Sequence, residues 1–215
     1  MKKITNIIFI FFSSYCRDFE SSLSLITSDI FKEMIYSWKD NNPIQPKDLR
    51  LVTVSYHGFD GKTYQGHLIV HALVAQEVIE IFKEIFDAGY PIEKLKLVDE
   101  YFGNDELSAQ DNNSYAFCSR SITGTSNKFS KHSYGLAIDI NPLYNPYHKD
   151  ALIIPSNGKK YLDRTIKTPA TLYKEHPCCQ AFIKRGWTWG GNWGKTKGYY
   201  DYHHFEKDPG LVDKS

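Results

Sequence analysis

An acidic side chain lies inside the most constrained short segment of this 215-residue chain. Asp139 interrupts the apolar run at residues 136–140. An ionised carboxylate in such a run is costly unless a partner compensates its charge. Successive side chains of a strand point to opposite faces, so Asp139 points away from the three large apolar side chains of the run. The run therefore predicts a short strand with one core face and one polar face that needs partners.

Histidines near this strand and near the C-terminus could supply those partners. His132 lies seven residues before Asp139, and Gly135 between them allows a bend that brings both side chains inward. His203 and His204 would point to opposite faces of a strand, so only one of them is expected to join the site. Imidazole and carboxylate both suit zinc, and two histidines with one aspartate would leave an open coordination position, as in catalytic zinc sites.

Two acidic residues flank the adjacent histidines His203 and His204. Asp201 lies three residues before His204, and a bend there would place it as a general base beside a water molecule at the open position. Glu206 shares a strand face with His204 and could orient that ligand. Isolated histidines more often occupy core or surface positions, so these residues alone leave the metal site as a hypothesis.

The overall charge argues against an electrostatic nucleic-acid binder. The chain has 26 basic and 25 acidic residues, whereas such binders usually carry a basic excess. The hydrophobic fraction of 41% is sufficient for a core. The length suits one domain with short extensions, and we expect a monomer.

The N-terminus has the pattern of a secretory signal. Two lysines precede a nearly apolar stretch at residues 4–12, which is too short to cross a hydrocarbon core of ~30 Å. We therefore expect a signal peptide at residues 1–16, no stable membrane span, and a secreted, periplasmic or cell-envelope location. The alternatives are a buried N-terminal element and a lipid anchor on Cys16, which the bulky Tyr15 disfavours.

The remaining cysteines allow two interpretations. The chain has no C-x-x-C pair, so a cysteine zinc site is not expected. The neighbours Cys178 and Cys179 are poorly placed to pair with each other. Cys118 could bridge to either of them in an oxidising compartment, or all three could be buried free thiols.

The hydrophobic patterns predict an α+β fold with a small, mainly antiparallel sheet and flanking helices. Residues 17–50 are interpreted as an N-terminal extension and residues 51–215 as the functional domain. Strands are expected at residues 51–56, 65–70, 95–101, 136–140, 187–191 and 202–206. Helices are expected at residues 28–38, 71–88 and 169–185, the last interrupted by Pro177. Residues 102–130 and 143–168 are expected to be long loops.

Two motifs resemble a known family of zinc peptidases. The motif Ser-x-His-x-x-Gly-x-Ala-x-Asp runs from Ser130 to Asp139, and Asp-x-x-His-Phe-Glu follows at residues 201–206. Both look like those of the zinc D-alanyl-D-alanine carboxypeptidases of the VanY type and of the related L-alanyl-D-glutamate endopeptidases of phage lysins. The resemblance extends from about Tyr56 to Glu206 and implies a fold of the hedgehog/DD-peptidase type.

The resemblance also implies the composition of a metal site. It implies one Zn²⁺ ion held by His132, Asp139 and His204, because His-Phe-Glu is the ending that the family shares. It implies that Asp201 is the catalytic base. His203 takes a place that is often Met in the family.

Three further residues are expected at the substrate. The resemblance makes Arg120 the substrate arginine, which would stabilise the oxyanion or bind a substrate carboxylate; a surface salt bridge is the alternative. Ser130 matches a position that helps to hold substrate. Trp189 is expected to line the site, although packing in the core would explain this tryptophan equally well.

The implied substrates are peptidoglycan stem peptides, and two alternatives remain open. The same machinery could act as a D-alanyl-D-alanine carboxypeptidase or as an L-alanyl-D-glutamate endopeptidase. The chain could instead be a non-catalytic zinc-containing module that binds cell wall or a protein, as in hedgehog-type relatives. An intact Asp201 disfavours the non-catalytic module.

Overall fold

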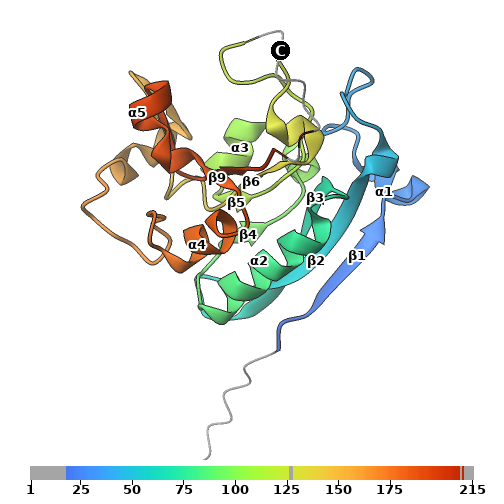
Figure 1. The fold of residues 1–215 in the computed structure, drawn as a ribbon, viewed down its shortest axis with the longest axis horizontal. Helices are drawn as coiled ribbons and strands as arrows, with labels where there is room; N and C mark the ends of the chain where they lie inside the picture. Colours follow the sequence, from blue (N-terminus) through green and yellow to red (C-terminus); the bar gives the residue numbers. More distant parts are fainter. Residues whose placement is uncertain (1–17, 126–127, 209, 211–215) are drawn as a thin grey trace, which may run out of the picture.

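A computed structural model describes residues 18–125, 128–208 and 210 of the chain. The predicted signal peptide, at residues 1–16, lies outside the described residues. A long, curved antiparallel sheet forms one side of the molecule, and several shorter strands lie beside it (Figure 1). This mixture of helices and small, mainly antiparallel sheets confirms the predicted α+β class.

The long sheet is built from three strands in the order β1-β2-β3. Strands β2 (Leu49–His57) and β3 (Thr63–His71) form the predicted hairpin. Strand β1 (Ser21–Leu25) pairs antiparallel with β2. The segment expected to be an N-terminal extension therefore supplies an edge strand of this sheet. It also supplies helix α1 (Ser28–Glu33) and the buried side chain of Met34.

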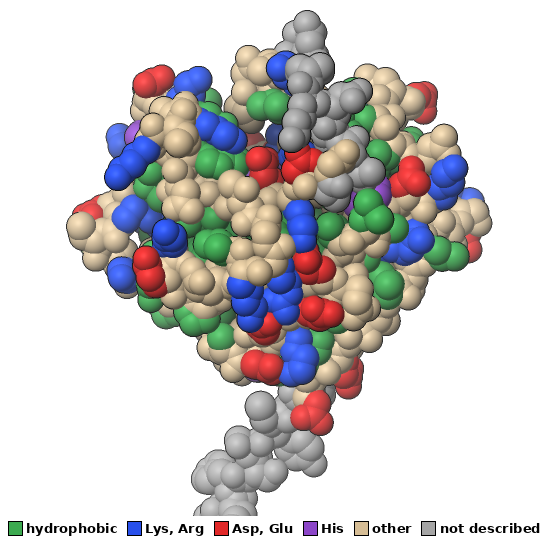
Figure 2. Space-filling view, viewed as in Figure 1, with side chains coloured by type: hydrophobic (Ala, Val, Ile, Leu, Met, Phe, Trp, Pro, Cys, Tyr) green, Lys and Arg blue, Asp and Glu red, His purple; other side chains and the backbone are tan. Residues whose placement is uncertain are grey.

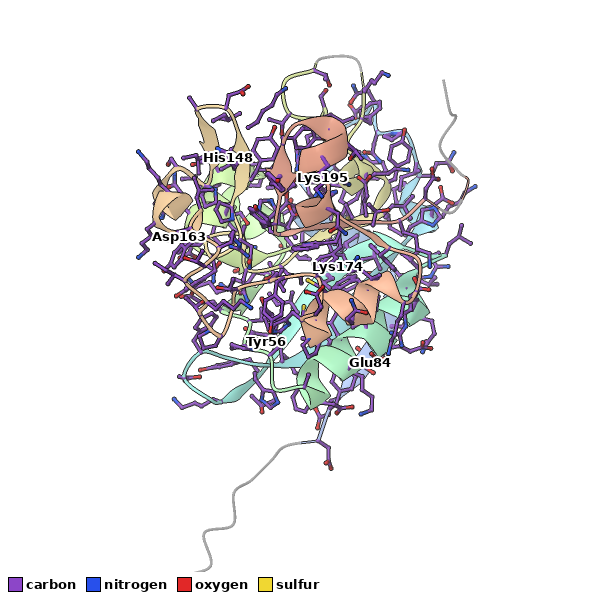
Figure 3. The ribbon with its side chains drawn as sticks, turned by 60° about the vertical axis from the view of Figure 1, so that its left-hand side comes forward. Tyr56, Glu84, His148, Asp163, Lys174 and Lys195 are labelled. Atoms are coloured by element: carbon purple, nitrogen blue, oxygen red, sulfur yellow. The ribbon has the colours of Figure 1, made fainter. Side chains whose placement is uncertain are left out.

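Two helices pack together against the core. Helix α2 (Ala75–Asp87) confirms the predicted amphipathic helix, and its apolar side chains are buried. Helix α4 (Pro177–Ile183) lies beside α2 (Figures 1 and 3), where Arg185 and Lys184 pair with Glu84. The prediction of a helix interrupted at Pro177 is wrong. Pro177 is the first residue of the helix, a position where its missing N–H group costs nothing.

Short strands carry the segments singled out from the sequence. Strands β6 (Ala137–Asp139), β11 (His204–Glu206) and β9 (Thr188–Trp189) form a sheet in the order β6-β11-β9. A second small sheet consists of β10 (Tyr200–Asp201), β7 (Tyr147–Lys149) and β8 (Leu152–Ile154). The parallel pair β4 (Lys94–Leu95) and β5 (Asn113–Ser114) completes the strands.

The structure corrects the predictions for residues 95–130 and 143–168. The prediction of a strand at residues 95–101 is wrong. Only Leu95 belongs to a strand, β4, and a 3₁₀ helix, η2 (Val98–Tyr101), follows. The first expected loop contains helix α3 (Asp105–Gln110), which Asn104 caps by accepting a hydrogen bond from the Leu107 N–H. The second contains the β7–β8 hairpin. The remaining short helices are η1 (Pro46–Asp48), η3 (Lys131–Tyr134), η4 (Ser156–Tyr161), η5 (Gly190–Asn192) and α5 (Gly194–Lys197).

The described cysteines and helices answer two questions raised by the sequence. Cys118, Cys178 and Cys179 are buried and free, and burial raises the pKa of the Cys118 thiol to about 12. The structure therefore contains the free thiols rather than a bridge. No helix in the described part of the chain is long and apolar enough to cross a bilayer.

The contact between α4 and β11 allows a stability prediction. The rings of Phe182 and Phe205 are fully buried and stack with their centroids 4.0 Å apart. Replacing Phe182 by alanine should lower the free energy of unfolding by about 3–5 kcal/mol, because the cavity adds to the lost burial. Urea denaturation measures this change. Ile166→Ala, at an exposed side chain, is the control and should change stability by less than about 0.5 kcal/mol. An unchanged urea concentration at the midpoint of unfolding for Phe182→Ala would contradict this packing.

Candidate metal centre

Three buried side chains from distant parts of the chain converge on one point. His132 Nε2 lies 3.2 Å from Asp139 Oδ2, and His204 Nδ1 lies 2.9 Å from Asp139 Oδ1. The two imidazole nitrogens are 3.2 Å apart. These three residues form the one group in the described part of the chain whose donor atoms are placed to hold a metal ion.

Local geometry explains how the first two side chains meet. His132 lies in the 3₁₀ helix η3, and Gly135 ends that helix in the left-handed conformation, with φ of 65°. A Cβ atom at Gly135 would lie 2.6 Å from the main-chain nitrogen of His71. Glycine is therefore required both by the conformation and by the close approach. The bend predicted at Gly135 is confirmed, and it turns the chain from η3 into β6.

Strand pairing brings in the third side chain. Strands β6 and β11 pair antiparallel, with His204 directly opposite Asp139. Side chains directly opposite each other in such a pair project to the same face, with Cβ atoms about 4.5–5.5 Å apart. The register of this pairing thus places the imidazole against the carboxylate.

Hydrogen bonds on the outer nitrogens orient both histidines. His132 Nδ1 faces the carbonyl oxygen of Ala116, which can only accept, so the proton must lie on Nδ1. His204 Nε2 lies 3.2 Å from Glu206 Oε2 and donates to it in the same way. Both inner nitrogens are then free to bind a metal ion, with carbonyl and carboxylate groups behind them as in known zinc sites. Glu206 occupies the supporting position predicted for it.

The donor set fits zinc in spacing and in charge. A tetrahedral zinc ion with ligands at about 2.0–2.1 Å separates its ligand atoms by about 3.3–3.4 Å, close to the observed spacings. Burial alone would raise the pKa of Asp139, but His132 and His203 hold it well below its ordinary value. Although burial opposes it, Asp139 and Glu206 raise the pKa of His204 to about 10, so without a metal ion its inner nitrogen holds a proton that the ion would displace. The site therefore favours a positive charge, which a metal ion would supply.

His203 also faces the site, although it was expected on the opposite face. Residues 202–203 form a turn between β10 and β11, so the strand alternation does not reach His203. Its Nδ1 donates to the carbonyl oxygen of Asn145 at 2.8 Å, while Nε2 lies 3.0 Å from Asp201 Oδ1 and 3.7 Å from Asp139 Oδ2. His203 thus lies between Asp201 and the metal site, outside the three-residue group itself.

Asp201 is partly buried at the cavity, and its buried Oδ1 atom has bonding capacity that is not used. Its side chain is 15% exposed and pairs with His203. The same Oδ1 atom accepts no hydrogen bond of good geometry from any described residue. A buried carboxylate oxygen without a hydrogen-bond donor can accept one from a ligand or from water. The predicted role of Asp201 as base stays a prediction that this geometry permits.

A cavity of about 850 Å³ opens beside these residues. Arg120 and Ser130 line it, together with Asp139, Asp201 and His204. Ser130 also caps η3, because its Oγ accepts a hydrogen bond from the His132 N–H at 3.3 Å. These positions agree with substrate contact, which stays a prediction for both residues.

Trp189 lies elsewhere. It is 5% exposed, belongs to the hydrophobic core, and donates its indole N–H to the Tyr202 carbonyl oxygen at 2.9 Å. Trp193 is the tryptophan that lines the cavity.

One comparison with known proteins finds a match for a part of the chain. Residues 123–207 match the sequence model of a family described as D-alanyl-D-alanine carboxypeptidase. No curated protein and no solved structure matches the chain. The match confirms the predicted resemblance for a segment that contains all three candidate ligands and Asp201. The match begins after Arg120 and after the three strands of the long sheet, so it covers neither.

Proposed function

We propose, from the match of residues 123–207 to the D-alanyl-D-alanine carboxypeptidase family, that this chain is a zinc peptidase of peptidoglycan stem peptides. The observation that supports it most directly is the convergence of His132, Asp139 and His204 beside a cavity lined by Asp201. Stem peptides lie outside the cytoplasm, which agrees with the secretory signal predicted at residues 1–16. That signal stays a prediction.

The proposed chemistry assigns one task to each side chain. A zinc ion at His132, Asp139 and His204 would supply Lewis acidity toward the scissile carbonyl and the attacking water. Asp201 takes the proton that the water loses and passes it to the leaving amine nitrogen. Arg120 donates N–H groups to the developing oxyanion or to a substrate carboxylate. Peptide and water thus yield an acid and an amine without a covalent enzyme intermediate.

The charges of the cavity suit an acidic peptide. Lys131 lies 3.6 Å from Asp208, and Lys197 lies 3.9 Å from Glu206. Lys128 and Lys149 line the same cavity and form no ion pair with a described carboxylate. The lining holds five Lys or Arg side chains against four carboxylates, and a zinc ion would add two further positive charges, so the cavity favours a substrate with free carboxylates. Basic and acidic side chains are interspersed over the face of the molecule shown in Figure 2.

The substrate and the bond that is cut can be tested together. We expect the purified full chain to hydrolyse muropeptides in the presence of zinc, and a chelator should stop the reaction, because three ligands hold one essential ion. Mass spectrometry of the products measures this. Loss of a terminal alanine would identify the carboxypeptidase, which we propose as the first choice because the matched family carries that description.

Other products would change the proposal in defined ways. Cleavage between the first two stem residues would identify an L-alanyl-D-glutamate endopeptidase with the same machinery. Zinc bound at one ion per chain without cleavage of any muropeptide would contradict a peptidase. That result would favour the non-catalytic cell-wall or protein-binding module.

A further inference from the structure

Tyr115 connects the candidate metal site to Arg120. Its main chain forms two hydrogen bonds with Asp139, of 2.9 and 3.1 Å, and its ring stacks on that of His132 with centroids 5.0 Å apart. Its hydroxyl donates to Asp105 Oδ1 at 2.9 Å and accepts from Arg120 Nη2 at 3.3 Å. One buried side chain thus contacts both a candidate ligand and the predicted substrate arginine.

The guanidinium of Arg120 is held on several sides. Asp105 pairs with it through Nε, in a contact whose angles do not make it a hydrogen bond. Nη1 donates to the carbonyl oxygen of Ser121 and Nη2 to the Tyr115 hydroxyl. Each of these two nitrogens has two N–H groups, so one N–H on each has no partner among the described residues. A carboxylate or an oxyanion of the substrate can accept hydrogen bonds from both of these neighbouring N–H groups.

The main chain of Arg120 is fixed relative to the candidate ligands. Ser133, the neighbour of His132 in η3, accepts a hydrogen bond from the Arg120 N–H at 2.9 Å and donates to the Arg120 carbonyl oxygen at 2.8 Å. The Ser130 N–H donates to the same carbonyl oxygen at 3.0 Å. The side-chain contacts therefore decide where the guanidinium points.

We propose that Tyr115 and Asp105 are positioning residues that aim the two remaining N–H groups on Nη1 and Nη2 of Arg120 into the cavity beside the metal site. This inference rests on the proposed function. All three residues line the cavity. A pre-oriented arginine loses less conformational freedom when it binds, so substrate and transition state bind more tightly.

The protonation states agree with this arrangement. Burial, followed by the charge of Asp105, raises the pKa of the Tyr115 hydroxyl well above its usual range, so this hydroxyl keeps its proton. Burial opposes the charge on Arg120, but Tyr115 and Asp105 hold its pKa well above the ordinary value. The hydroxyl can then donate to Asp105 and accept from Arg120 at the same time.

A double-mutant cycle between Tyr115 and Arg120 tests the proposal. Tyr115→Phe removes the hydroxyl and keeps the ring that stacks on His132. It should lower kcat/KM for stem-peptide hydrolysis about tenfold, as expected for one hydrogen bond to a charged group. In the Arg120→Ala background the same change should lower it by less than about twofold, since the hydroxyl acts through the guanidinium. Zinc content should stay at the wild-type level in all variants.

A second readout does not need hydrolysis. The same cycle is measured as the affinity of zinc-free protein for a muropeptide by calorimetry, where Tyr115→Phe should weaken binding only when Arg120 is present. Asp105→Asn should act in the same direction as Tyr115→Phe. Tyr101→Phe is the matched control, because its hydroxyl also donates to an aspartate, Asp111 at 2.7 Å, but neither residue lines the cavity.

The outcomes separate this inference from the proposed function. An equal effect of Tyr115→Phe with and without Arg120, no effect in the wild type, or a loss of zinc would overturn the positioning role. A wild-type chain that cleaves no muropeptide would contradict the peptidase, while the binding cycle would still decide whether Tyr115 acts through Arg120.

Discussion

Replacing His204 by alanine is expected to lower zinc affinity by more than about 100-fold and to abolish muropeptide hydrolysis. A change in a group that only supports a ligand costs about 10–100-fold in metal affinity, and His204 is itself a candidate ligand, opposite Asp139 across the β6–β11 pair. The variant also leaves the buried carboxylate of Asp139 with one partner fewer. Metal analysis of purified protein measures the zinc content, and product masses measure the hydrolysis.

A second histidine provides the control for this experiment. His67 is an exposed residue of β3 whose Nδ1 bonds to Thr53, and it lies outside the cavity. His67→Ala should keep one zinc ion per chain and full activity. If the His204 variant still held zinc at wild-type affinity, the ligand assignment would be wrong, and the register of β11 against β6 would have no functional meaning.

Replacing Asp201 by asparagine should separate metal binding from catalysis. The asparagine keeps the size of the side chain but cannot take a proton, and general base catalysis contributes about 10²–10⁴-fold. We expect kcat to fall by about 10³-fold or more, with zinc content unchanged, because Asp201 contacts His203 and none of the three ligands. Steady-state kinetics and metal analysis of the same preparation measure both quantities.

An exposed aspartate is the matched control for this change. Asp163, labelled in Figure 3, accepts hydrogen bonds from Thr165 and lies outside the cavity. Asp163→Asn should leave kcat unchanged. Undiminished turnover in the Asp201 variant would remove this residue from the mechanism. A zinc-loaded, inactive Asp201 variant would instead contradict the non-catalytic module, because such a module has no turnover to lose.

Three features were predictable because they depend on residues close together in the sequence. The apolar run around Asp139 required a partnered carboxylate, and Gly135 marked the bend that η3 and β6 share. The helix over residues 75–87 followed from its repeat of apolar side chains. These signals are carried by spacings of a few residues, which steric and hydrophobic rules interpret directly.

Other predictions failed because local spacing is a poor guide to short elements. The strand expected at residues 95–101 is mostly a 3₁₀ helix, and the helix expected from residue 169 begins only at Pro177. The alternation of side chains predicts His203 on the far face, because this alternation does not reveal the turn at residues 202–203. Tertiary contacts override weak local preferences in elements of two to seven residues.

The sequence by itself determined which side chains could bind a metal ion, and only the tertiary structure decided that they meet. His204 lies 65 residues after Asp139 and faces it through the register of one strand pair. The contact of Tyr115 with Arg120 depends in the same way on where the segment before β6 lies in the fold. Donor chemistry belongs to each residue, whereas register depends on the burial of all the strands at once.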